Sequence, residues 1–99
     1  MKKIAIFGST GSIGSSLLRI INADKKNFKI ELLTANKNYK KIIKQAKSFN
    51  VKNIIITDIN SFIAATKLLK NTKVKVFKNF DSLNKIFNIN KKIDYSMCA

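Results

Sequence analysis

All three glycines of the 99-residue chain lie close together, at Gly8, Gly11 and Gly14. They follow a short apolar run at residues 3–7 and precede a segment whose apolar side chains recur at helical spacing. In a turn between a buried strand and a helix, the first such glycine allows a tight bend. The second lets the backbone approach a pyrophosphate, and the third lets the helix pack closely on the strand. The spacing GxxGxxG therefore predicts a dinucleotide cradle, with a merely flexible turn as the alternative.

The start of the helix after these glycines would supply the groups that bind phosphate. A helix that begins at Ser12 and Ile13 presents unpaired backbone N–H groups and the positive end of its dipole. The hydroxyls of Ser9, Thr10 and Ser12 add short donors. The loop is not closed by a Gly-Lys-Ser/Thr sequence, which disfavours a phosphate-loop NTPase.

A second group of polar residues follows the second predicted strand. Enzymes that bind NAD commonly place Asp or Glu there, about 20 residues beyond the glycines, to accept hydrogen bonds from the ribose 2′-hydroxyl. This chain has Asn36, Lys37 and Asn38 instead. A carboxylate would repel a 2′-phosphate, whereas an ammonium and two amides could bind one, so we predict NADP rather than NAD. The alternative is that Lys37 is one more lysine on a lysine-rich surface.

Three further residues are weaker candidates. Asp58 follows the third predicted strand and could contact adenine or ribose, but a turn-forming or helix-capping role is the favoured interpretation. Tyr39 could shield an adenine edge or simply cover the second predicted helix. Cys98, on a predicted strand, is expected to be a small core residue rather than a nucleophile.

The elements that must position these residues follow from the spacing of apolar side chains. Continuous apolar runs at residues 3–7, 30–34 and 53–57 indicate buried strands. Helical spacing predicts helices over residues 12–22 and 39–49. We expect the first helix to face the sheet with Ile13, Leu17, Ile20 and Ile21, and the second with Ile42, Ile43, Ala46 and Phe49.

The rest of the chain continues the alternation. Asn60 or Ser61 could cap a third helix, and lysines alternate with apolar residues over 73–77, which predicts a strand near a sheet edge. Asp81 could cap a short helix, and residues 93–99 begin another strand. Strands and helices joined by short polar segments indicate right-handed crossovers. We therefore predict an α/β fold, a Rossmann-like parallel sheet with flanking helices, incomplete at the C-terminus.

The composition limits the remaining possibilities. With 45% hydrophobic and 25% charged residues, the chain suffices for one small domain. Every apolar run is too short for a membrane span or a signal peptide, so we predict a cytoplasmic protein with no membrane contact. The chain has no histidine, one cysteine and five carboxylates. We therefore predict no metal site and no catalytic residue within it.

The net charge of +15 would ordinarily suggest a nucleic-acid partner. Arg19 is the only arginine among the 20 basic residues, and the lysines are spread along the chain. Base and phosphate recognition favours arginine forks, which lysine cannot form. We therefore predict a solvated lysine surface and no specific nucleic-acid partner. A basic nucleic-acid binder is the alternative, and tight DNA or RNA binding with a steep salt dependence would reveal it.

Two segments carry a resemblance to a known family. Residues 8–14, GSTGSIG, and residues 35–38, ANKN, resemble the opening of 1-deoxy-D-xylulose 5-phosphate reductoisomerases. Family members usually have glycine at the position of Asn36, and asparagine is the residue that next best tolerates a left-handed backbone. Together, motif and resemblance give the predicted cofactor-binding residues, which are Gly8, Thr10, Gly11, Ser12, Ile13 and Gly14 near the pyrophosphate, and Asn36, Lys37 and Asn38 near the 2′-phosphate.

The resemblance implies NADPH-dependent conversion of 1-deoxy-D-xylulose 5-phosphate into 2-C-methyl-D-erythritol 4-phosphate, an early step of non-mevalonate isoprenoid biosynthesis. Such enzymes bind a sugar-phosphate substrate, use a divalent metal, Mg or Mn, and are usually homodimers. Residues 1–99 would be part of the NADPH-binding domain, with the metal ligands and the catalytic and C-terminal domains absent. We therefore predict no turnover by this chain alone. The alternative is a stand-alone, non-catalytic dinucleotide-binding module.

Overall fold

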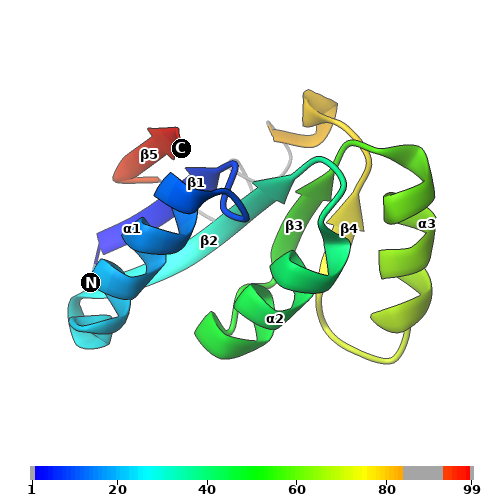
Figure 1. Ribbon diagram of the computed structural model, residues 1–99. Coiled ribbons are helices and arrows are strands. Elements are labelled where there is room, and N and C mark those ends of the chain that lie inside the picture. Colours follow the sequence, from blue (N-terminus) through cyan, green and yellow to red (C-terminus); the bar gives the residue numbers. More distant parts are fainter. Residues whose placement is uncertain (1, 84–92, 99) are drawn as a thin grey trace.

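Strands and helices alternate along the chain in the computed structural model, which describes residues 2–83 and 93–98 (Figure 1). The elements are β1 (Lys2–Phe7), α1 (Ser12–Asn22), β2 (Phe28–Ala35), α2 (Tyr39–Phe49), β3 (Asn53–Ile56), α3 (Ile59–Leu68), β4 (Lys75–Phe77) and β5 (Tyr95–Cys98). Short 3₁₀ turns occupy Lys25–Asn27 and Phe80–Ser82. The predicted alternation is present, and β2 extends beyond its predicted range at both ends.

The described strands form one parallel sheet in the order β4-β3-β2-β1-β5. From β1 to β4 each strand lies beside the one before it, and α1, α2 and α3 cover the same face of the sheet (Figure 1). Strand β5 lies on the other side of β1, so the strand order reverses at that point. The predicted Rossmann-like parallel fold is confirmed. The edge position predicted for residues 73–77 is also confirmed, because β4 ends the described sheet.

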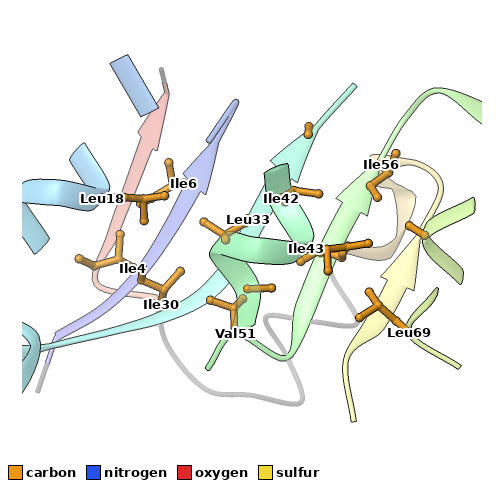
Figure 2. Packing of buried hydrophobic residues seen from close by; sticks show 14 of the residues in the cluster. Ile4, Ile6, Leu18, Ile30, Leu33, Ile42, Ile43, Val51, Ile56 and Leu69 are labelled. Atoms are coloured by element: carbon orange, nitrogen blue, oxygen red, sulfur yellow. The ribbon is translucent and has the colours of Figure 1, made fainter. Parts of the chain in front are cut away.

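The main apolar core lies between the sheet and these three helices. Leu18 of α1 lies beside Ile4 and Ile6 of β1, and Ile42 of α2 belongs to the same cluster (Figure 2). The opposite face of the sheet also has a buried cluster, formed around Ala5, Leu32 and Ile55. Strand β3 is buried along its whole length, as the continuous apolar run predicts for a strand covered on both faces.

The face that α1 turns toward the sheet differs from the predicted one. Ile13 and Ile20 are 64% and 69% exposed, whereas Leu18 and Ile21 are buried together with Gly14. Gly14 packs against the backbone that follows β1, and this contact sets the rotation of the helix. Positions four and seven residues after Gly14, rather than after Ile13, therefore face the core. The prediction for Ile13 and Ile20 was wrong, and that for Ile21 was right.

Two smaller predictions need correction, and a third falls mostly outside the described residues. Helix α3 is capped by Asp58, whose carboxylate accepts a hydrogen bond from the Ser61 N–H at 3.0 Å, and not by Asn60 or Ser61. At Asp81, the backbone N–H donates to the Asn79 side chain, which begins the 3₁₀ turn. Most of the short helix predicted there lies outside the described residues. Cys98 is exposed on β5 rather than in the core.

Within residues 2–83 and 93–98, no helix is long and apolar enough to cross a membrane.

Candidate functional site: the glycine loop and the end of β2

The chain leaves β1 through a sharp bend that we call the glycine loop, residues 8–11. Gly8 has a φ of 78°, in the left-handed region that favours glycine. Its N–H donates to Thr34 Oγ1 at 2.8 Å, and the Ser9 N–H donates to the Thr34 carbonyl at 3.0 Å. The bend predicted for the first glycine is therefore present, and it is fastened to the end of β2.

Gly14 brings α1 directly onto this loop. A Cβ atom at Gly14 would lie 2.5 Å from the Gly8 carbonyl oxygen and 2.6 Å from Ser9 Cα. Both distances are far shorter than carbon atoms tolerate, so only glycine fits without a shift of backbone. The close helix packing predicted for the third glycine is present.

Gly11 differs from the other two glycines. Its φ of −75° and ψ of 177° are open to other residues, and an added Cβ would meet only the Gly8 carbonyl oxygen, at an ordinary 3.7 Å. Neither backbone conformation nor packing within the described chain requires glycine here. Because Gly11 has no side chain, the backbone at the start of α1 is uncovered.

The first turn of α1 has free hydrogen-bond donors. Gly11 is the N-cap residue and provides no side-chain cap, and the Ser15 N–H is bonded to the Gly11 carbonyl at 2.9 Å. The N–H groups of Ser12, Ile13 and Gly14 precede that bond and have no partner within the helix. Amides at a helix N-terminus carry partial positive charge, so this turn suits an anion.

Helix α2 holds the glycine loop through two side chains, Gln45 and Lys41. Ser9 is fully buried; its hydroxyl donates to Gln45 Oε1 at 2.8 Å, and Gln45 Nε2 donates to the Ser9 carbonyl at 2.9 Å. Lys41 Nζ donates to the Thr10 carbonyl at 2.8 Å. Neither Gln45 nor Lys41 was expected from the sequence. The only signal was a pair of polar residues one helical turn apart, beside the apolar face of α2.

The second polar segment lies where β2 ends, and all three of its residues are exposed. Asn36 Oδ1 accepts a hydrogen bond from the Thr57 hydroxyl at 2.9 Å. Asn38 Oδ1 caps α2 by accepting from the Lys41 N–H at 3.3 Å. The two side-chain oxygens therefore hold the segment in place, and the amide nitrogens remain as donors. Among the described residues, the Lys37 ammonium forms no ion pair within 4.0 Å.

Asp58 follows β3 at the same edge and serves as the cap of α3, which confirms the helix-capping interpretation. The backbone N–H and then the hydroxyl of Ser61 donate to its carboxylate and lower its pKa, with a smaller lowering from the nearby Lys37 ammonium. Desolvation opposes these effects. Tyr39 packs against the main core, so it covers α2 as one of its two interpretations predicts.

The nine predicted cofactor-binding residues lie at the end of the sheet where the strands have their carboxyl ends. Residues 8–14 follow β1 and residues 36–38 follow β2, which is its parallel neighbour. Thr34 joins the two segments through its bonds to Gly8 and Ser9. Ligands of open α/β sheets bind outside the carboxyl ends of the strands where the strand order reverses, and here that place is beside β1.

Residues 4–99 match the family model of 1-deoxy-D-xylulose 5-phosphate reductoisomerase. The chain belongs to this family. The resemblance expected from two short segments is thus confirmed over nearly all of the sequence.

Two relatives match this chain over all of its 99 residues. It is 82% identical over 99 residues to the 1-deoxy-D-xylulose 5-phosphate reductoisomerase of Pelagibacter ubique (strain HTCC1062), covering 100% of this chain and 26% of that protein. It is 33% identical to the enzyme of Ehrlichia canis (strain Jake), covering 100% of this chain and 25% of that protein. The chain therefore spans about a quarter of the length of these relatives.

Solved reductoisomerases share the fold. The Zymomonas mobilis enzyme in complex with NADPH superposes with a TM-score of 0.77 at 29% identity, covering 86% of this chain and 22% of that one. A reductoisomerase in complex with NADPH, fosmidomycin and magnesium gives a TM-score of 0.83 at 23% identity, covering 97% and 24%. The second likeness concerns the fold alone. The first also concerns a relative whose structure is a complex with NADPH, the cofactor predicted from the sequence.

Proposed function

We propose that residues 1–99 form part of the NADPH-binding domain of a 1-deoxy-D-xylulose 5-phosphate reductoisomerase. The observation that carries the proposal is Gly11. Its conformation and its surroundings would both accept a side chain, yet the position is bare and lies at the uncapped start of α1. A ligand that must approach the backbone closely accounts for this glycine, and the free amides of α1 suit a pyrophosphate.

The end of β2 supports NADPH over NADH. The Lys37 ammonium and the amide nitrogens of Asn36 and Asn38 are donors, and residues 36–38 contain no carboxylate. Such a set suits a 2′-phosphate, which offers only acceptors and negative charge. The complex of the Zymomonas mobilis relative with NADPH is consistent with this choice.

In this proposal the chain binds and orients the cofactor. Thr10, Gly11, Ser12 and Ile13 hold the pyrophosphate region, Gly8 and Gly14 shape the loop, and residues 36–38 hold the adenosine 2′-phosphate. NADPH, when bound, supplies hydride.

The described residues bring together no three His, Cys, Asp or Glu side chains that could hold a metal ion. They therefore do not fit the magnesium or manganese of the family, and we assign no metal ligand and no catalytic residue to them.

The wider family properties remain part of the same proposal. They are the conversion of 1-deoxy-D-xylulose 5-phosphate into 2-C-methyl-D-erythritol 4-phosphate, a sugar-phosphate substrate, a cytoplasmic location, and homodimers without a nucleic-acid or membrane partner. The catalytic and C-terminal domains would correspond to the parts of the relatives that this chain does not match. We expect no NADPH oxidation when the 99-residue protein is mixed with 1-deoxy-D-xylulose 5-phosphate and Mg²⁺.

Calorimetric titration of the folded protein with NADPH and with NADH tests the proposal. We expect saturable binding of both, with NADPH tighter because only it carries the 2′-phosphate. A folded sample that binds neither dinucleotide would remove the proposal.

A further inference from the structure

We propose that Gln45 of α2 is a positioning residue for dinucleotide binding, which orients the backbone of the glycine loop without touching the ligand. This inference rests on the proposed binding of NADPH by that loop. It starts from the pair that Gln45 forms with Ser9, whose hydroxyl and carbonyl both meet the Gln45 amide.

The distances favour one arrangement of the pair, because the Ser9 hydroxyl lies nearer to Gln45 Oε1 than to its other acceptor, the Thr34 carbonyl at 3.4 Å. Gln45 Oε1 accepts from the Ser9 hydroxyl at 2.8 Å, and Gln45 Nε2 donates to the Ser9 carbonyl at 2.9 Å. Turning the amide over would place its oxygen against the carbonyl oxygen, where neither atom can donate. Ser9 is 0% exposed, so water does not readily replace the partner of its hydroxyl or carbonyl. The Ser9 carbonyl is therefore held in one direction, toward α2.

That direction sets the orientation of the next amide. The described chain has no cis peptide bond, and in a trans peptide the C=O and N–H groups point to opposite sides. With the Ser9 carbonyl turned toward α2, the Thr10 N–H points away from α2. Lys41 holds the Thr10 carbonyl in the same way, and the following Gly11 N–H donates to the Gly8 carbonyl at 3.3 Å and closes the turn.

Loss of the Gln45 amide would free the peptide unit between Ser9 and Thr10 to rotate. Amides that bind an anion must converge on it, so a rotating unit weakens the site even when the fold is intact. NADPH and NADH share the pyrophosphate. A defect in the glycine loop should therefore weaken both by the same factor, whereas a defect at residues 36–38 should weaken NADPH alone.

Gln45→Met tests the inference, because methionine has nearly the same length and apolar volume but cannot form either hydrogen bond. We expect the Kd values of NADPH and NADH each to rise about tenfold, which corresponds to about 1.4 kcal/mol. The control is Ile42→Val, which removes a methyl group from a buried residue of the same helix. This control should lower the melting temperature and leave both Kd values unchanged, which separates positioning from general support of α2.

The outcomes distinguish this inference from the proposed function. If the wild-type protein binds neither dinucleotide, the proposed function fails first. If the wild type binds and Gln45→Met leaves both Kd values unchanged, or weakens NADPH alone, the positioning role is overturned. Should Gln45→Met fail to fold, Ser9→Ala removes the hydroxyl half of the pair and should raise both Kd values about threefold. Unchanged values in that variant would equally overturn the inference.

Discussion

Replacing Gly14 by alanine tests whether α1 rests on the backbone of the glycine loop. The new Cβ would lie 2.5 Å from the Gly8 carbonyl oxygen and 2.6 Å and 2.8 Å from Ser9 Cα and carbonyl carbon. All three atoms are backbone, and hydrogen bonds to Thr34 hold both residues in place. The helix or the loop must therefore shift.

The size of the effect follows from two opposing contributions. Overpacking a well-filled site costs about 1–3 kcal/mol, and three backbone overlaps place this case near the upper end. Alanine recovers about 1 kcal/mol because it forms helix more readily than glycine. We expect a net loss of about 1–2 kcal/mol in the free energy of unfolding, which lowers the melting temperature of a domain this size by about 5–15 °C.

Thermal unfolding followed by far-UV circular dichroism measures this loss. Ser16→Ala on the exposed side of α1 is the matched control and should melt within about 3 °C of the wild type. If Gly14→Ala melts as the control does, α1 does not pack on Gly8 and Ser9 as described. The account of the third glycine would then be wrong.

Three other changes give results of different kinds. Gly11→Ala should keep the free energy of unfolding within about 0.5 kcal/mol of the wild type and weaken NADPH at least about tenfold by calorimetry; unchanged binding would contradict the cradle. Lys37→Glu should weaken NADPH binding by about 10- to 150-fold, because it removes about 1.5–3 kcal/mol of charged hydrogen bonding, and should leave NADH binding unchanged. Equal effects on the binding of both dinucleotides would contradict the 2′-phosphate site. Asp58→Ala should lower the melting temperature at neutral pH. Because Ser61 lowers the folded-state pKa of Asp58, its stabilisation is full above the unfolded pKa and lost as the pH falls through the folded pKa. The melting temperatures of Asp58→Ala and the wild type should therefore converge as the pH falls through the folded-state pKa. A difference that stays constant with pH would contradict the capping account.

The order of elements could be predicted because its signals are local. Continuous apolar runs mark β1 and β3, and the range predicted for α2, residues 39–49, matches the structure at both ends. The glycine spacing likewise identified the turn between β1 and α1. Strand, helix and turn preferences act between residues that are close in the sequence, so a single sequence reveals them.

The errors arose where several residues offered the same local signal. Ile13 and Ile20 are as apolar as Leu18 and Ile21, and only the fit of Gly14 against the loop decides which pair is buried. Asp58, Asn60 and Ser61 are all good capping residues, and hydrogen-bond geometry selects the first. The pairing of Gln45 with Ser9 spans 36 residues, and no periodicity in either segment encodes it.

The structure also shows which site residues argue for a ligand. Gly8 and Gly14 have identities that the fold itself explains, through a positive φ and a crowded helix contact. Asn38 is similarly explained as the cap of α2. Gly11 and Lys37 are different, because packing within the described chain does not require glycine at the first position, and the ammonium at the second forms no ion pair within 4.0 Å there. Their variants should therefore alter dinucleotide binding with little change in the melting temperature, and loss of stability without loss of binding at both positions would mean that the edge beside β1 is built for the fold alone.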